Sequence, residues 1–535
     1  MKPDKLALAI LLLLSPLCVQ AIDKRPNILL IVADDLGYAD LGAYGSDIRT
    51  PNIDGLASEG VLFTRFHTAP MCAPTRAQLL SGNNNHVAGV GRQHPRGLLR
   101  AHMPGYEGHL SDRVAPLPAL LKGVGYHTYI AGKWHLGIEP ENSPVAAGFE
   151  RSFGLLDGAG SHFDGRGFEN GPSVYGADGK AAKYPSGSYS TELYTDRLIE
   201  FIESNRGDGQ PFFAFASYTS PHWPLQVPEG ERDLYKGVYD DGYDALRESR
   251  FRSLIRAGII PRSSVLPPRW EAIARWETLT KEQQQRESRK MELYAAMVDN
   301  LDRHVGRLLE YLKANGLYEN TLIVFLSDNG AAPRDFYNEA PYMDYVRGHY
   351  DNAYPNMGGP DSFVSYGAAW AEAGSAPFKR HKGFTSEGGI STPMIIAGKG
   401  VARRNELSRA YAHVMDLAPT FLELARASYP DDGSVAPMLG ESMGEFLRNR
   451  ASSIHDENHV TLQYHRGHAY IRQGDWKLML LDPPFDESGF GLYNLAVDPG
   501  EIHDLSAEEP AKRAELIELW RARRVELGIV LPGDL

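Results

Sequence analysis

Two continuous apolar runs, each followed by acidic residues, constrain the fold of this chain more than any other feature. The first, residues 27–33, is followed by Asp34 and Asp35, and the second, residues 321–326, is followed by Ser327-Asp328-Asn329-Gly330. Runs without polar interruption are typical of strands buried on both faces, as in parallel sheets. Ligands bind at the carboxyl ends of such strands. We therefore expect the acidic side chains to converge at one edge of a sheet.

The chain between the two runs indicates an α/β fold. Apolar residues recur at helical spacing over residues 293–312 and stop at Asn315-Gly316, just before the second run. Three other short apolar runs, at residues 126–131, 211–216 and 393–397, also end beside polar residues. We expect one large, mixed, mostly parallel sheet flanked by helices to include all of them.

The pattern changes near residue 456, where short alternating strands begin and a helical tail follows over residues 511–527. A chain of 535 residues is long enough for more than one domain. We predict an α/β catalytic domain over residues 22–455 and a small C-terminal α+β domain with an antiparallel sheet over residues 456–535. The charged, proline-interrupted residues 230–287 are expected to form a surface insertion with short helices.

The first 21 residues are typical of a removable signal peptide. Lys2 and Lys5 precede an apolar run over residues 6–17 that is too short to span a bilayer, and Val19-Gln20-Ala21 resembles a cleavage site. A lipid anchor on Cys18 is the alternative, although Leu17 stands where a small residue is expected. We expect a soluble periplasmic or secreted protein with no membrane contact after leader removal. The net charge of −13 argues against nucleic-acid binding.

The oxygen-bearing residues at the two strand ends predict a site for a hard cation. Carboxylate and amide oxygens are the ligands that Ca²⁺ and Mg²⁺ prefer. Asp34 and Asp35 could instead cap the helix that follows them. Acidic residues at two strand ends favour the metal, since like charges gathered at one buried edge repel unless a cation neutralises them. The candidate ligands are Asp34, Asp35, Asp328 and Asn329.

Cleavage of the leader would leave Cys72 as the only cysteine, so an intramolecular disulfide is excluded. Pro74 suits a first helical turn and Gly82 a helix end, which places Cys72 at a helix N-terminus. Free amides there, with Arg76 close by, favour an anion or a developing oxyanion. The alternative is a buried cysteine that acts as a small apolar side chain.

Residues 72–82, CAPTRAQLLSG, resemble the first signature of the type I sulfatases, in which the cysteine of C-x-P-x-R is oxidised to formylglycine. Residues 125–135, GYHTYIAGKWH, resemble the second signature. Ser81, where threonine is more usual, is a small departure. The resemblance extends from Pro26 to the tail and is nearest to bacterial arylsulfatases. It implies an alkaline-phosphatase-like fold.

The resemblance also implies roles for particular residues. One Ca²⁺ would be held by Asp34, Asp35, Asp328, Asn329 and the modified Cys72. The hydrated aldehyde would offer one hydroxyl to attack sulfur and another whose deprotonation expels sulfate. Calcium would stabilise the attacking alkoxide and bind a sulfate oxygen.

Other side chains would assist this chemistry. Lys133 and Lys382 would neutralise the sulfate oxygens, and Arg76 would hold the hydrated aldehyde. His135 would assist the elimination of sulfate, and His222 would protonate or stabilise the leaving alcohol. Each residue alone has a simpler interpretation, since lysines are usually solvated and His222, before Trp223-Pro224, could be a turn residue. Their joint occurrence in family order favours the catalytic interpretation.

The sequence thus predicts an exported, calcium-dependent sulfuric ester hydrolase of arylsulfatase type. Its partners would be a small sulfated substrate and a maturation enzyme that forms formylglycine. A phosphonate or phosphate ester hydrolase is one alternative, and a non-catalytic sulfate- or glycan-binding protein is another. A second metal is not required, because there are no clustered cysteines for zinc and the histidines show no tight metal-ligand spacing.

Overall fold

The computed structural model describes residues 25–93, 103–167 and 171–534. The expected leader, residues 1–21, therefore lies outside the described residues. Within the three described ranges, none of the helices combines the length and the apolar character needed to cross a bilayer.

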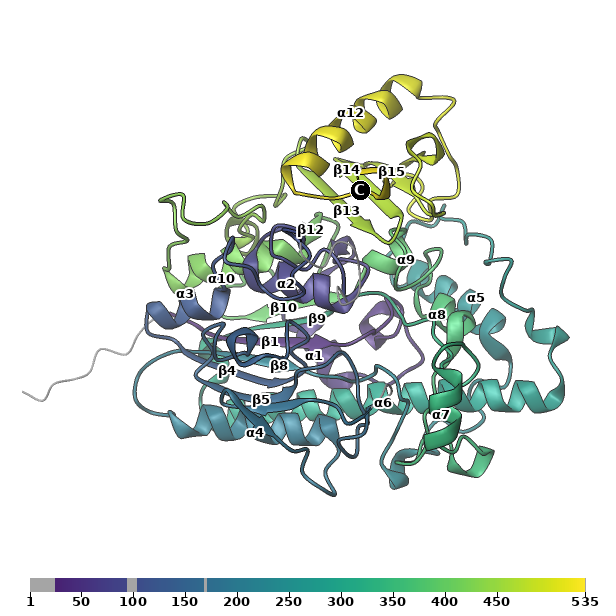
Figure 1. The fold of residues 1–535 in the computed structure, drawn as a ribbon, viewed down its shortest axis with the longest axis horizontal. Coiled ribbons are helices and arrows are strands. Elements are labelled where there is room, and N and C mark those ends of the chain that lie inside the picture. Colours follow the sequence, from purple (N-terminus) through teal and green to yellow (C-terminus); the bar gives the residue numbers. More distant parts are fainter. Residues whose placement is uncertain (1–24, 94–102, 168–170, 535) are drawn as a thin grey trace, which may run out of the picture.

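A mixed sheet of ten strands runs through the larger part of the described chain (Figure 1). Its five central strands, from β9 to β5, are mutually parallel, and the flanking pairs are antiparallel except β11 with β2. In sheet order the strands are β11 (Glu406–Ser408), β2 (Val61–Phe63), β10 (Met394–Gly398), β9 (Thr321–Ser327), β1 (Asn27–Ala33), β8 (Phe212–Ser217), β4 (His127–Gly132), β5 (Arg151–Leu155), β6 (Tyr175–Ala177) and β7 (Lys180–Ala182). This arrangement confirms the predicted fold class.

The two apolar runs are the neighbouring central strands β1 and β9. Every residue of both strands is buried. They pair in parallel with Ala33 opposite Ser327, so the residues that follow them leave the sheet at the same level. The three other apolar runs fall in β4, β8 and β10, as expected.

Alternate residues of β1 enter different hydrophobic cores, which explains why the strand has no polar face. Leu29 and Ile31 pack with helices α1, α4 and α6 on one face, whereas Ile28 and Leu30 pack with α2, α3 and α10 on the other. The helices of the larger part are α1 (Pro51–Glu59), α2 (Cys72–Ser81), α3 (Leu117–Gly123), α4 (Ser190–Ser204), α5 (Gly242–Arg256), α6 (Lys281–Ala314), α7 (Met343–His349), α8 (Gly367–Gly374), α9 (Glu387–Ile390), α10 (Leu417–Ala425) and α11 (Gly444–Leu447).

The segment expected as a surface insertion contributes to the core. Tyr235, Tyr239 and Tyr243 are buried in the same cluster as the α6 side chains. The buried Arg250 forms ion pairs with Asp40 and Asp47, which lie in the loop after β1. The segment carries short helices and much exposed surface as predicted, but it is not only a surface insertion, because its aromatic residues recur between the charges and face inward. The predicted helix over residues 293–312 lies within α6, which begins earlier, at a capping box.

A small antiparallel sheet follows the larger part and lies at the top of Figure 1. Its strands, in order, are β13 (Val460–His465), β14 (His468–Gln473), β15 (Trp476–Leu480) and β16 (Gly491–Asn494). Helix α12 (Pro510–Glu526) covers this sheet with the buried side chains of Leu516 and Trp520. A separate two-stranded sheet joins β3 (Phe66–His67) and β12 (Ala412–His413). The small sheet matches the predicted α+β unit, and the boundary at residue 456 stays a prediction.

Buried charges join the small sheet to the larger part. Lys477 of β15 lies 2.7 Å from Glu387 at the start of α9 and 2.7 Å from Glu501. Glu387 also contacts His67 Nε2 at 2.6 Å. Unpaired charges are costly to bury, so this network fixes α9 and the loop before it. That loop carries Lys382.

Candidate active site

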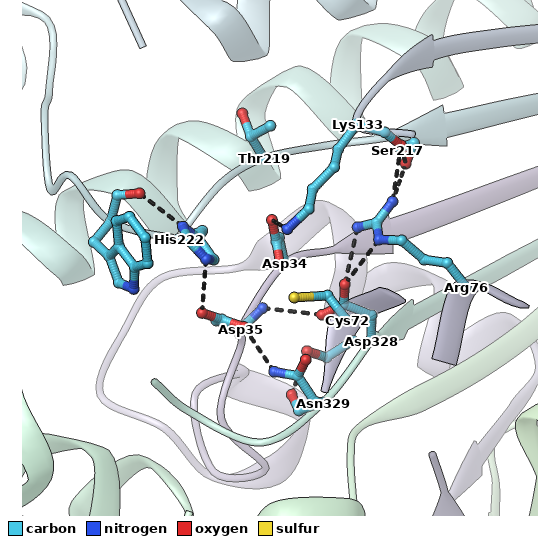
Figure 2. A network of polar contacts seen from close by, with 12 residues as sticks. Asp34, Asp35, Cys72, Arg76, Lys133, Ser217, Thr219, His222, Asp328 and Asn329 are labelled. Atoms are coloured by element: carbon cyan, nitrogen blue, oxygen red, sulfur yellow. Dashed lines mark hydrogen bonds and ion pairs between the residues drawn. The ribbon is translucent and has the colours of Figure 1, made fainter. Parts of the chain in front are cut away.

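Four oxygen-bearing residues meet where β1 and β9 end (Figure 2). The Asp35 amide donates to Asp328 Oδ1 at 3.2 Å, and Asn329 Nδ2 donates to Asp35 Oδ1 at 2.6 Å. Asp34, Asp35, Asp328 and Asn329 are each at most 1% exposed. The parallel register of the two strands accounts for this convergence, as expected from the sequence.

Two buried lysines contact these carboxylates. Lys133, which follows β4, donates from Nζ to Asp34 Oδ2 at 2.7 Å. Lys382 donates to Asp35 Oδ1 at 2.5 Å and to Cys72 Sγ at 3.3 Å. Burial disfavours the Lys382 ammonium, but Asp35 and the other acidic groups around it together outweigh burial and raise the pKa of Lys382. The alternative that these lysines are solvated surface charges is therefore wrong.

Cys72 is the first residue of α2 and is fully buried. The helix ends at Gly82, whose left-handed backbone lets its amide bond Gln78 O at 2.9 Å. Burial raises the pKa of the Cys72 thiol, although Lys133 and Lys382 act in the opposite direction. The unmodified side chain is therefore a neutral thiol at physiological pH.

Arg76 lies one helical turn beyond Cys72, and its hydrogen bonds go to the strand ends. Nε and Nη2 donate to Asp328 Oδ2 at 3.1 and 2.9 Å. Nη1 donates to Lys133 O at 2.9 Å and to Ser217 Oγ at 2.6 Å. Sequence reasoning missed Ser217, although its place as the polar residue after an apolar run was an available signal. The expected contact of Arg76 with a hydrated aldehyde stays a prediction.

His222 lies in the loop after β8. Nδ1 donates to Trp223 O at 2.7 Å, because a carbonyl oxygen can only accept. In the neutral ring Nε2 then carries a lone pair, and it lies 3.3 Å from Asp35 Oδ2. Burial lowers the pKa of His222 well below its usual range, despite the opposing effect of Asp35. Two acceptors thus face each other, an arrangement that a cation between them would relieve.

His135 follows Lys133 by two residues and has a left-handed backbone, with φ of 58°. Its ring packs against Gly158, where an added Cβ would lie 2.6 Å from His135 Cε1. The absence of a side chain at Gly158 therefore determines where the imidazole can lie. No sequence pattern singled out this glycine.

The side chains at the strand ends fit a hard divalent cation. Asp34 Oδ1, Asp35 Oδ2 and Asn329 Oδ1 are buried and make no hydrogen bond. Ligand atoms of Asp34, Cys72 and Asp328 lie within 4.8 Å of one another, as do those of Asp34, Asp35 and His222. Burial raises the pKa of Asp34 and of Asp328, and each is raised further by a neighbouring carboxylate. A cation would favour their ionised forms, and oxygen donors suit Ca²⁺ or Mg²⁺.

Comparison with known proteins finds similarity to one family across most of the chain. The family model described as Sulfatase matches residues 26–427, and one described as N-sulphoglucosamine sulphohydrolase, C-terminal, matches residues 379–523. An uncharacterized sulfatase of Schizosaccharomyces pombe is 38% identical over 540 residues, covering 96% of each chain. An arylsulfatase of Klebsiella aerogenes is 37% identical over 457 residues, covering 83% of this chain and 96% of the relative.

A solved structure has the same architecture. The crystal structure of Ps i-CgsB in complex with k-i-k-neocarrahexaose superposes with a TM-score of 0.67 at 25% identity. The match covers 93% of this chain and 92% of that one. It therefore includes the central sheet and extends well into the smaller C-terminal sheet.

Proposed function

Because this chain belongs to the sulfatase family and is a sulfuric ester hydrolase, we propose that it hydrolyses aryl sulfates to a phenol and inorganic sulfate. One observation carries the proposal: Lys382 Nζ lies 3.3 Å from Cys72 Sγ and 2.5 Å from Asp35 Oδ1. Lys382 thus contacts both the residue proposed as nucleophile and a carboxylate suited to bind a metal. Its buried ammonium is itself suited to bind a sulfate oxygen.

Oxidation of Cys72 to formylglycine is part of the proposal. Burial keeps the unmodified thiol protonated, and a neutral thiol is a weak nucleophile. Formylglycine would supply a hydrated aldehyde whose hydroxyl attacks sulfur and whose second hydroxyl allows sulfate to leave. A maturation enzyme that acts on the C-x-P-x-R motif is the partner this implies.

A bound Ca²⁺ is also proposed. Asp34, Asp35, Asp328, Asn329 and the modified Cys72 would hold it, since three buried oxygens of this set make no hydrogen bond. Calcium would supply positive charge next to the nucleophile and the sulfate group. Arg76 would orient Asp328 toward the ion through its two bonds to Oδ2.

The remaining side chains would bind the sulfate and move protons. Lys133 and Lys382 already lie in a water-excluded site, where an ammonium attracts developing negative charge more strongly than in water. His135 would take the proton whose loss allows sulfate to leave, and His222 would serve the leaving oxygen. Gly158 leaves the space that the His135 ring needs.

Aromatic side chains next to His222 favour an aromatic leaving group. The Trp223 ring lies 4.2 Å from the His222 ring and 4.2 Å from Phe336, centroid to centroid. Tyr350 and Phe363 continue this cluster. These three rings are buried and support Trp223, whose partly exposed ring could stack on a planar leaving group. A sulfated sugar is the alternative, because a solved relative was crystallised with neocarrahexaose.

Measurement of the Cys72 peptide mass tests the proposal. Protein matured in a competent host should contain an aldehyde at residue 72, detectable with a carbonyl probe, and should release nitrophenol from nitrophenyl sulfate. Cys72→Ala should abolish turnover. An intact thiol would favour a sulfate- or glycan-binding protein. Faster turnover of the matching phosphonate or phosphate ester would favour that hydrolase class. Detection of the mature protein in the periplasm or medium would test the proposed export.

A further inference from the structure

A second group of metal-ligating side chains lies where the chain passes into the small antiparallel sheet. Glu441 belongs to the loop between α10 and α11, and His455 and His459 belong to the segment before β13. Ligand atoms of the three residues lie within 4.8 Å of one another. The group shares no residue with the carboxylates at the strand ends.

The hydrogen bonds of His455 are those of a metal-binding histidine. Nε2 donates to Asp416 Oδ2 at 2.8 Å, and Asp416 is held by the amides of His413 and Glu441 at 2.7 and 2.9 Å. The other nitrogen, Nδ1, lies 3.2 Å from Glu441 Oε1 without a hydrogen bond, in a side chain that is only 3% exposed. Metal-ligating histidines usually bind through one nitrogen while the other donates to a carboxylate in this way.

His459 completes the group. Its Nδ1 donates to the same Glu441 oxygen at 3.0 Å, a bond that a metal ion between the two atoms would replace. Its Nε2 is buried without a hydrogen bond, and its ring stacks on His455 at 3.7 Å. A tetrahedral zinc ion with bonds of about 2.0–2.1 Å separates its ligand atoms by about 3.3 Å. The observed distances from the carboxylate oxygen to the two nitrogens are close to that value.

We propose that Glu441, His455 and His459 bind a divalent transition metal of the Zn²⁺ class. Two imidazole nitrogens suit zinc and are poor ligands for Ca²⁺. Glu441 is exposed, so solvent can supply a fourth ligand. The ion would stabilise the junction, because it would join the loop after α10 to the segment that enters β13. The expectation that the histidines lack ligand spacing overlooked His455 and His459, which have the H-x₃-H spacing of zinc sites.

Zinc titration of the full-length protein tests this site. The protein is first stripped with a chelator, then returned to excess Ca²⁺ so that the strand-end site is not available to zinc. Calorimetry should detect one Zn²⁺ per chain, and Glu441→Gln and His459→Ala should each weaken binding at least about 10- to 100-fold. His503→Gln, at an exposed histidine, should bind zinc like the unmodified protein.

Thermal unfolding provides a second readout. Zinc should raise the Tm of the unmodified protein and of His503→Gln, but not that of Glu441→Gln or His459→Ala. Both site variants change side chains near the surface, so they are expected to fold. The proposal is overturned if the unmodified protein binds no zinc at micromolar concentration, or if all variants bind it equally. No step measures ester hydrolysis, so the result is independent of the proposed function.

Discussion

Lys133 and Asp34 form an ion pair in which neither side chain has exposed surface, with 2.7 Å between Nζ and Oδ2. Replacing Lys133 by Met leaves the carboxylate buried without its cation. We expect the free energy of unfolding, measured by urea denaturation in the presence of a calcium chelator, to fall by about 3–5 kcal/mol. If Lys133 also binds sulfate, kcat/KM for nitrophenyl sulfate should fall at least about 100-fold.

Lys122 offers a matched control, because it is an exposed lysine in α3. Lys122→Met should change the free energy of unfolding by less than about 0.5 kcal/mol. Equal effects of the two substitutions would contradict the importance of the buried pair.

Arg76 makes four hydrogen bonds to three strand ends, one more than the three donors of a lysine ammonium allow. Arg76→Lys keeps the charge but loses the fork that reaches Asp328, Lys133 O and Ser217. Each buried group left without a partner costs about 1–3 kcal/mol. We expect lower stability in urea and weaker calcium binding by calorimetry, since Asp328 loses its orientation.

Arg197→Lys is the control, which tests whether the effect of an arginine-to-lysine change depends on where the arginine lies. Arg197 pairs with Glu200 on the exposed side of α4. Exposed pairs contribute about 0–1 kcal/mol, so this variant should keep the stability and calcium affinity of the unmodified protein. Calcium affinity unchanged in Arg76→Lys would show that Arg76 does not position a metal ligand.

The sequence alone predicted those site residues that directly follow buried strands. Asp34 and Asp328 could be placed together because buried strands are visible as apolar runs, and parallel pairing brings their ends to one edge. The lysines and histidines came from family motifs, since nothing local distinguishes Lys382 from a surface lysine. Its burial depends on packing between segments far apart in the chain.

Other features depend on contacts that no local pattern encodes. Ser217 meets Arg76 across 141 positions of the chain. Gly158 matters only because the His135 ring lies where its Cβ would be. The spacing of His455 and His459 is visible in the sequence, but their convergence with Glu441 requires the fold.

The contacts of His127 predict how the stability of the folded protein changes with pH. Its ring nitrogens lie 2.8 Å from Glu150 and 2.7 Å from Asp208. Burial alone would lower the pKa of His127, but the two carboxylates raise it above its usual value. The folded state therefore binds the proton more tightly than the unfolded state. The resulting stability is fully present below about pH 6.5 and is lost as the pH rises through the raised pKa.

We therefore expect His127→Gln to destabilise the protein more at about pH 5.5 than at about pH 9. Urea denaturation of both proteins at the two pH values measures the difference. The double variant Glu150→Gln with Asp208→Asn should remove most of the pH dependence that His127 confers. If His127→Gln destabilised the protein more at alkaline than at acidic pH, the assignment of a protonated His127 in the folded protein would be contradicted.

Gly158→Ala tests whether the position of His135 matters for catalysis. The added Cβ would lie 2.6 Å from Cε1 and 2.7 Å from Nε2 of the His135 ring, so the imidazole must move. We expect kcat for nitrophenyl sulfate to fall at least about 10-fold, because proton transfer by a positioned side chain contributes about 10²- to 10⁴-fold. Calcium affinity should not change, since the three atoms nearest to the added Cβ all belong to His135, which is not a proposed calcium ligand. Gly123→Ala, where an added Cβ meets no atom within 4 Å, is the control and should keep full activity. If Gly158→Ala lowers calcium affinity and kcat together, a general disturbance of the site would explain the loss, and a proton-transfer role for His135 would lose its support.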